Sequence, residues 1–99
     1  MTSNGNVGFG LLGAGLIAPF HAKSIQAADG CELVAVADLD AQRASKVADQ
    51  FGCDGRKSLD ELLGDDRIDV VYILLPNHLH RDATVQSAQA GKHVLVEKP

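Results

Sequence analysis

The residues best suited to chemistry are a glycine-rich turn near the N-terminus, Gly-Ala-Gly-Leu-Ile-Ala at positions 13–18. Gly13 permits a tight turn, and Gly15 lets the backbone approach a diphosphate because no Cβ intervenes. Ala18 allows the helix that follows to pack close to a sheet. An anion then lies where free backbone amides and the positive end of the helix dipole converge. A glycine turn also joins strand to helix without any ligand, and this structural interpretation stays open.

An acidic residue supports the ligand-binding interpretation. Asp38 lies 20 residues beyond Ala18, at the end of a predicted strand, where a carboxylate can bind the ribose hydroxyls of an adenosine. A carboxylate repels a 2′-phosphate, and Leu39 and Asp40 follow it without an arginine, so the sequence favours NAD over NADP. In the alternative interpretation Asp38 is a turn residue or helix N-cap, although Asp40 is also placed to cap that helix.

The secondary structure that holds these residues can be predicted from the hydrophobic pattern. Short apolar runs alternate with segments of helical spacing, which predicts an α/β fold: a doubly wound, Rossmann-type parallel sheet with strand order 3-2-1-4-5. The expected strands are residues 7–12, 32–37, a short one near 53–56, 70–75 and 94–96. The expected helices are about residues 16–28, 40–51, 58–63 and 80–90. The sheet is incomplete, because the chain stops directly after the fifth strand.

Several local features of these elements can be predicted. The candidates for burial on the first helix are Ile17, Phe20, Ala27 and Ala28. Pro19 falls in the first turn of that helix, where a missing N–H costs little. Gly52 is placed to end the second helix, and Ser58 with Glu61 matches a capping box. Six consecutive apolar residues at 70–75 predict a strand buried on both faces.

Composition limits the classes of function. A chain of 99 residues with 45% hydrophobic residues fits one globular domain. Nine basic against 13 acidic residues, net −4, argue against nucleic acid or an anionic membrane as a partner. Cys31 and Cys53 lack the spacing of metal ligands, so no metal site is predicted, and both are expected to be apolar core residues. Without a signal peptide or membrane span, a cytoplasmic location is expected.

Three segments resemble the Gfo/Idh/MocA oxidoreductases, a family that includes glucose-fructose oxidoreductase and inositol dehydrogenase. They are residues 13–21 with 34–38, residues 68–80, and residues 91–99, which end in Glu-Lys-Pro. The resemblance extends over about residues 7–99. It implies the NAD-binding Rossmann domain of an oxidoreductase that transfers a hydride between a polyol, sugar or related hydroxyl compound and a nicotinamide cofactor.

The resemblance also implies roles for individual residues. Lys98 is the implied catalytic residue, beside the nicotinamide and the substrate hydroxyl. Glu97 lies near the cofactor, and the peptide bond before Pro99 is expected to be cis. Pro76 and Asn77 line the nicotinamide ribose. In the alternative interpretation Lys98, next to the chain end, is a solvated side chain.

The cofactor-binding candidates are Gly13, Ala14, Gly15, Leu16, Ile17, Asp38, Pro76, Asn77, His80 and Glu97. His80 enters as the last residue of the Pro-Asn-x-x-His turn, although capping or packing of its helix is favoured over acid–base chemistry.

The family's substrate domain and its acid–base histidine would follow Glu-Lys-Pro. We therefore expect residues 1–99 to be a truncated chain, natural or engineered, that binds NAD without turning over a substrate. The uncovered last strand predicts self-association with a second copy. The competing interpretations are a non-catalytic nucleotide-sensing or interaction module and an engineered Rossmann fragment that pairs with itself.

Overall fold

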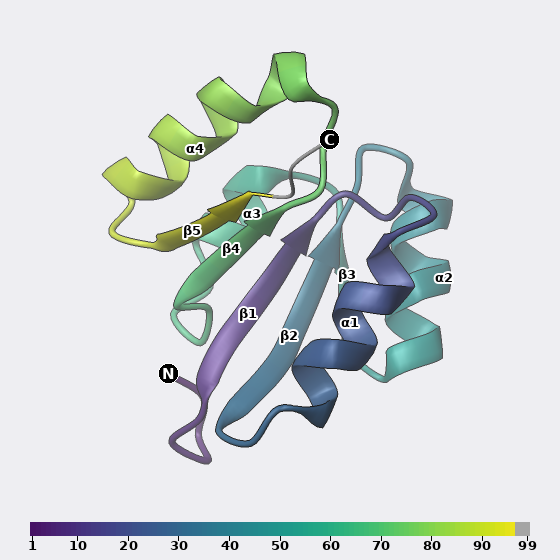
Figure 1. Ribbon diagram of the computed structural model, residues 1–99, viewed down its shortest axis with the longest axis vertical. Helices are drawn as coiled ribbons and strands as arrows, with labels where there is room; N and C mark the ends of the chain where they lie inside the picture. The colour runs from purple at the N-terminus through teal and green to yellow at the C-terminus, as the bar shows by residue number, and fades with distance from the viewer. Residues whose placement is uncertain (97–99) are drawn as a thin grey trace.

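Parallel strands alternate with helices along the part of the chain that the structure, a computed structural model, describes: residues 1–96 (Figure 1). The strands are β1 Val7–Leu12, β2 Cys31–Ala37, β3 Asp54–Arg56, β4 Val70–Ile73 and β5 His93–Val96. The helices are α1 Ala18–Ala27, α2 Ala41–Phe51, α3 Leu59–Leu63 and α4 His80–Gln89, with a 3-10 turn, η1 Asn77–Leu79, before α4. The sheet order is β3-β2-β1-β4-β5 with every pair parallel, which confirms the predicted topology.

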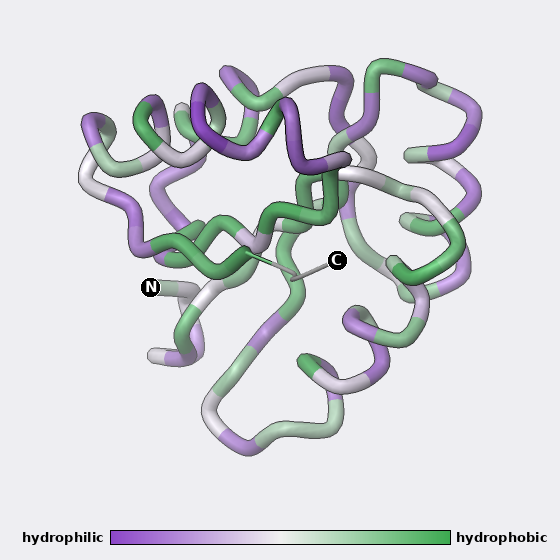
Figure 2. The backbone as a smooth tube through the Cα atoms, turned by 45° about the horizontal axis from the view of Figure 1, so that its top comes forward, coloured by the Kyte–Doolittle hydropathy of each residue, from purple (hydrophilic) through white to green (hydrophobic). Residues whose placement is uncertain are grey.

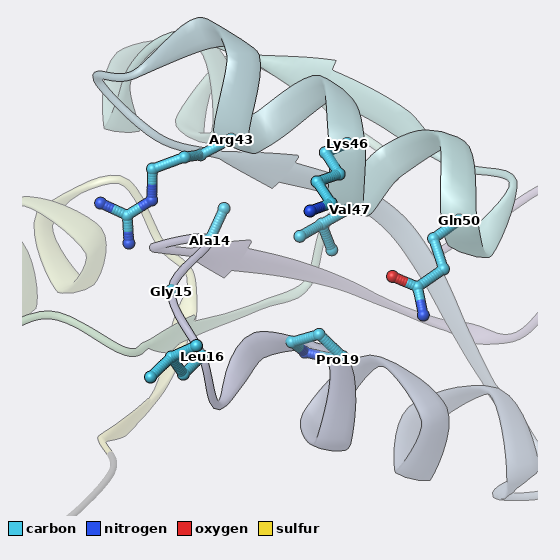
Figure 3. A pocket seen from close by; sticks show the side chains of 8 residues that line it. All are labelled: Ala14, Gly15, Leu16, Pro19, Arg43, Lys46, Val47 and Gln50. Carbon is cyan, nitrogen blue, oxygen red and sulfur yellow. The ribbon is translucent and has the colours of Figure 1, made fainter.

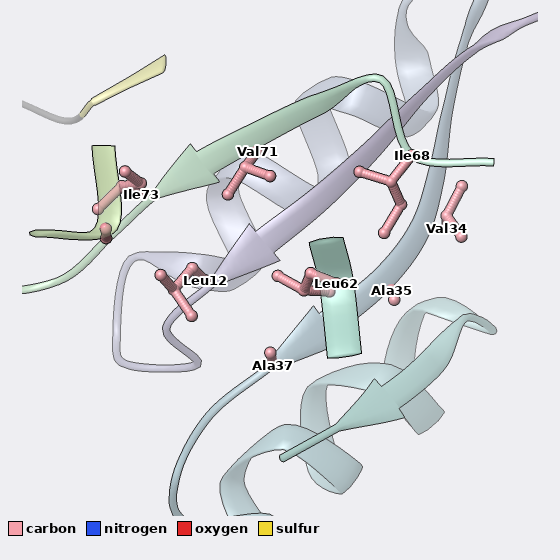
Figure 4. Close-up of a cluster of buried hydrophobic side chains, with 9 residues drawn as sticks. Leu12, Val34, Ala35, Ala37, Leu62, Ile68, Val71 and Ile73 are labelled. Carbon is pink, nitrogen blue, oxygen red and sulfur yellow. The ribbon is translucent and has the colours of Figure 1, made fainter. Parts of the chain in front are cut away.

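Neighbouring strand residues point to opposite faces of the sheet and so supply two cores. Leu11 and Val36 pack with buried residues of α1 and α2 on one face. Leu12 and Ile73 lie on the other face, in a cluster that also contains Leu62 of α3 and Ala83 of α4 (Figure 4). Burial on both faces is the arrangement expected of a parallel sheet, and it holds the carboxyl ends of β1, β2 and β4 in fixed positions.

Helix α1 differs from the prediction in both its start and its buried face. It begins at Ala18, two residues later than expected, and Pro19 lies in its first turn as predicted. The predicted burial was wrong, because Ile17, Phe20, Ala27 and Ala28 are all exposed, Phe20 to 73%. The buried residues are instead Ala18, Ala22 and Ile25. Their spacing of four and three follows one helical stripe, and the alanines let the helix approach the sheet closely.

Strand β4 ends at Ile73, two residues before the predicted end. The amide of Leu74 still donates to the carbonyl of Leu12, at 2.8 Å, but β1 ends there. Pro76 has no N–H to continue a ladder. Leu74 and Leu75 are therefore half-buried residues of a connection, although their apolar character continues the pattern of the strand.

The predicted helix caps are present, with one difference. Asp40 caps α2, and Gly52 ends it in the left-handed conformation, with φ of 69°. The hydroxyl of Ser58 accepts from the amide of Glu61 at 3.4 Å. The Glu61 carboxylate, however, takes the amide of Lys57 at 2.6 Å rather than that of the cap residue itself.

An ion-pair network joins the loop before β4 to β3. The Arg67 guanidinium Nη2 lies 2.7 Å from Asp65 Oδ2 and 3.0 Å from Asp54 Oδ2, and Arg56 also contacts Asp54, at 3.0 Å. The hydrogen bonds from Arg67 are the main reason that the pKa of each aspartate lies below its ordinary value of 3.8.

Strand β5 forms one edge of the sheet in residues 1–96. Figure 2 shows it as a largely apolar segment. Leu95 is 46% exposed and Val96 39% exposed. In the same part of the chain, no helix combines the length and the apolar character that crossing a membrane requires.

Candidate functional site

The glycine turn after β1 is fixed between two neighbouring strands. Gly13 has φ of 112°, and a Cβ on this residue would lie 2.9 Å from the carbonyl oxygen of Leu74. Its N–H donates to the carbonyl of Ala37 at 2.8 Å. Only glycine combines this backbone conformation with so close an approach, which confirms the predicted tight turn.

The turn presents unpaired backbone donors at the start of α1. Within residues 1–96, no hydrogen-bond acceptor is found for the N–H groups of Gly15, Leu16 and Ile17. The N-cap position of α1 provides no side-chain cap, and Leu16 is 94% exposed. Ala18 is fully buried, so the helix start lies against the sheet as predicted. These free amides fit an anion such as a diphosphate.

The carboxylate of Asp38 connects the glycine turn to the loop after β2. Its Oδ2 accepts from the amide of Ala14 and its Oδ1 from the amide of Asp40, each at 2.8 Å. Helix α2 is capped by Asp40, whose carboxylate accepts from the amides of Gln42 and Arg43, so the N-cap interpretation of Asp38 is wrong. A carboxylate can accept about four hydrogen bonds, so each oxygen of Asp38 can also accept a hydroxyl.

Gly13, Gly15, Asp38 and Pro76 line one cleft. Its volume is about 240 Å³, and its remaining lining residues are Leu39, Arg43, Leu74 and Leu75. The cleft lies at the carboxyl ends of β1, β2 and β4, where the sheet order reverses between β1 and β4. Parallel α/β sheets bind ligands at this switch point. The four predicted residues, far apart in sequence, therefore meet where a dinucleotide would be expected.

A second cleft adjoins the first and separates α1 from α2 (Figure 3). Its volume is about 390 Å³, and its lining residues are Ala14, Gly15, Leu16, Pro19, Arg43, Lys46, Val47 and Gln50. Gly15 and Arg43 line both clefts. Lys46 adds a second cationic side chain to this side of the glycine turn.

Arg43 is a site residue that the sequence prediction missed. Its Nη2 would lie only 3.0 Å from a Cβ on Gly15, so the guanidinium covers the glycine turn. No arginine follows Asp38 directly in the sequence, but the first turn of α2 brings Arg43 to the cleft that Asp38 lines. The usable signal was an arginine five positions after the acidic residue, in the first turn of the next helix.

Of the predicted site residues after β4 that the structure describes, one lines the first cleft and two do not. Pro76 lines the first cleft, whereas Asn77 begins η1 and is exposed. His80 lines neither cleft; its ring Nε2 bonds to the carbonyl of Leu75. Glu97, Lys98 and the peptide bond before Pro99 lie outside the described residues.

Known proteins match this chain over nearly all of its length. A family model described as an oxidoreductase family with an NAD-binding Rossmann fold matches residues 7–99. Inositol 2-dehydrogenase of Rhizobium meliloti strain 1021 is 41% identical over 93 residues, which cover 94% of this chain and 28% of that protein. D-xylose 1-dehydrogenase (NADP(+)) 2 of Haloferax volcanii is 45% identical over 93 residues, which cover 92% of this chain and 28% of that protein.

A solved structure shares the fold. The WlbA dehydrogenase of Chromobacterium violaceum, in complex with NADH and UDP-GlcNAcA, has a TM-score of 0.89 to this chain and 31% sequence identity. The match covers 99% of this chain and 29% of that chain. The chain thus spans less than a third of the length of the relatives it matches.

Proposed function

The chain belongs to the Gfo/Idh/MocA oxidoreductase family as its NAD-binding Rossmann domain, and from this premise we propose where its cofactor binds. The dinucleotide crosses the switch point between β1 and β4. Its diphosphate accepts hydrogen bonds from the amides of residues 15–17, and its adenosine ribose bonds to Asp38. The observation that carries this proposal is that Asp38 lines one cleft with Gly13 and Gly15, and that the amide of Gly15 is the first of the three free amides at the start of α1.

The cofactor is a nicotinamide dinucleotide, and we propose that NAD is preferred over NADP. The carboxylate of Asp38 accepts ribose hydroxyls and repels a 2′-phosphate. Arg43 lines the same cleft and offsets part of that repulsion. Relatives use both forms, since the name of the xylose dehydrogenase specifies NADP and the WlbA complex holds NADH.

The relatives are more than three times as long as this chain. We propose that the whole protein oxidises or reduces a polyol, sugar or related hydroxyl compound. A bound nicotinamide supplies the hydride acceptor or donor. The proposed role of Lys98 is to hydrogen-bond the substrate oxygen and balance its developing charge. Glu97, Pro76 and Asn77 are proposed to lie along the nicotinamide half of the cofactor.

Residues 1–99 alone are proposed to bind the cofactor without turnover. Hydride transfer requires the substrate, the nicotinamide and an acid–base group to be held together in a narrow range of geometry. The match covers 28% of inositol 2-dehydrogenase, so residues 1–99 by themselves correspond to less than a third of that enzyme. A rise in NADH absorbance on incubation with NAD and a panel of polyols would contradict this part of the proposal.

Calorimetric titration tests the binding site directly. We expect the chain to bind NAD and ADP-ribose, and Asp38→Ala to weaken NAD by about 1–3 kcal/mol, the loss of a charged hydrogen-bond acceptor. Asp49→Ala is the matched control, because Asp49 is exposed on α2 and lines neither cleft. Unchanged affinity in Asp38→Ala would remove Asp38 from the site, whereas failure of the unmodified chain to bind either ligand would overturn the cofactor proposal.

A cytoplasmic location is proposed with this function, and its support is the state of the cysteines. Cys31 and Cys53 are free, half-buried and packed against the core on the α1 side. Burial, the largest cause, raises the pKa of the Cys53 thiol to about 11, so this residue is in its unreactive form at neutral pH. The absence of nucleic-acid partners remains a prediction from the charge balance.

A further inference from the structure

The connection between β4 and α4 is held by a side chain rather than by the usual helix caps. The ring of His80 bonds to the carbonyl of Leu75, five residues earlier. The carbonyl oxygen can only accept, so Nε2 carries the hydrogen and donates it. His80 is the first residue of α4 and is half-buried. Its imidazole therefore closes a loop around the intervening residues.

Backbone hydrogen bonds do not provide this closure. Within the connection, the amide of Leu79 donates to the carbonyl of Pro76 at 2.9 Å, and the amide of His80 donates to the carbonyl of Asn77. Neither the N-cap position of η1 nor that of α4 provides a side-chain cap. The backbone bonds reach back only to Pro76, whereas the hydrogen bond from the His80 ring joins the start of α4 to Leu75, the residue before the proline.

The closed segment forms one wall of the cofactor cleft. Leu75 and Pro76 line that cleft together with Asp38, and the carbonyl of the adjacent Leu74 abuts Gly13. A shift of this segment would change both the width of the cleft and the support of the glycine turn. His80 lines neither cleft, so any effect on a ligand there passes through Leu75.

We propose that His80 is a positioning residue, which sets the wall of the cofactor cleft by donating Nε2–H to the carbonyl of Leu75. The inference rests on the proposed function in that the cleft is taken to receive the dinucleotide. It assigns no proton transfer and no direct ligand contact to His80. The required feature of the side chain is a hydrogen-bond donor at the position of Nε2.

A first test needs no cofactor. Heteronuclear NMR of the imidazole nitrogens in the unliganded chain, at a pH where the ring is neutral, identifies which nitrogen carries the hydrogen. We expect the Nε2–H form to predominate. Predominance of the Nδ1–H form would overturn the inference and leave the cofactor proposal standing.

A second test uses two substitutions at the same position. His80→Phe keeps a ring without a donor, and His80→Gln keeps an amide donor at similar reach. We expect His80→Phe to raise the Kd for NADH about three- to tenfold, as for loss of one hydrogen bond, and His80→Gln to restore affinity to within about twofold of the unmodified chain. His78→Phe is the matched control, since His78 is exposed on η1 and lines neither cleft.

Unfolding curves separate positioning from general stability. Titrations well below the unfolding midpoint count only folded molecules, so a purely structural role would lower the midpoint and leave the Kd unchanged. An unchanged Kd in His80→Phe, or equal weakening in both His80 variants, would overturn the inference. If His80→Phe does not fold, His80→Ala, which also lacks the donor, is compared with His80→Gln in the same titrations. Absence of NADH binding by the unmodified chain would instead overturn the proposed function.

Discussion

Two side chains with opposite charges meet at the proposed adenosine end of the cleft. The carboxylate of Asp38 is fixed by the amides of Ala14 and Asp40, whereas Arg43 is exposed and lines the space on both sides of Gly15. The fixed carboxylate disfavours a 2′-phosphate, and the exposed guanidinium attracts one. The balance between NAD and NADP should therefore depend on both residues.

Substitution of Arg43 should change that balance. We expect Arg43→Ala to weaken NADPH binding about three- to tenfold more than NADH binding, because a charge-assisted hydrogen bond to the 2′-phosphate is lost at an exposed site. Fluorescence titrations with both cofactors measure the ratio. Arg81→Ala removes the same charge from the exposed surface of α4 and should leave the ratio unchanged. Equal weakening of both cofactors in Arg43→Ala would show that Arg43 does not read the phosphate.

Among individual residues, the sequence predicted the cleft residues that lie just after strands but not Arg43, whose side chain reaches the cleft from α2. Gly13, Gly15, Asp38 and Pro76 each lie within three residues after a strand or its apolar extension, and the structure brings them together in one cleft. Arg43 was missed because its proximity depends on the start and direction of α2. The bond from Asp38 to the glycine turn likewise depends on β1 lying beside β2, which is a tertiary arrangement rather than a local pattern.

Among the elements, the turn from β1 to α1 is constrained by both its backbone conformation and a close backbone contact. Gly13 combines φ of 112° with a close approach to Leu74, whereas Gly30 has φ of 79° and open space around it. Two single variants, one with alanine at Gly13 and one with alanine at Gly30, separate the cost of backbone strain from that of steric contact. We expect Gly30→Ala to cost about 1 kcal/mol and Gly13→Ala about 1–3 kcal/mol more, measured by urea unfolding. Equal losses would show that the carbonyl of Leu74 moves away without cost.

The order and type of the elements followed from the sequence, but two boundaries did not. Apolar residues continue past Ile73, yet the strand ends because its neighbour β1 ends and Pro76 lacks an N–H. The buried face of α1 was predicted wrongly because large residues such as Phe20 were expected inside. The close distance between helix and sheet instead favours alanine. Both outcomes depend on neighbouring elements, which hydrophobic spacing alone does not describe.

For the molecule as a whole, stability should decrease in acid. The pKa values of Asp54 and Asp65 are lower in the folded chain than their ordinary value of 3.8, mainly through hydrogen bonds from Arg67. Their contribution is complete above pH 3.8 and is lost as the pH falls below it toward the folded-state pKa values. Urea unfolding at a series of pH values should show this decrease, and Arg67→Ala should make it shallower. An identical pH dependence in Arg67→Ala would exclude the network as its cause.

Association between copies is a second prediction at this scale. Strand β5 lies at the sheet edge in the described residues, and Leu95 is 46% exposed. Edge strands with exposed apolar residues pair readily with another chain. We expect sedimentation to show dimers at high concentration and Leu95→Lys to shift the population toward monomer. Monomers alone at every concentration would contradict association through β5.

The anchoring of the glycine turn has a consequence for how fast a ligand can bind. Bonds to Ala37 and Asp38 hold the turn in its final shape before any ligand arrives. The entropy of ordering this segment is therefore lost during folding rather than on association. Encounter with a diphosphate then needs no slow closure step, so the observed association rate should rise linearly with ligand concentration, as in simple one-step docking to a preorganised receptor.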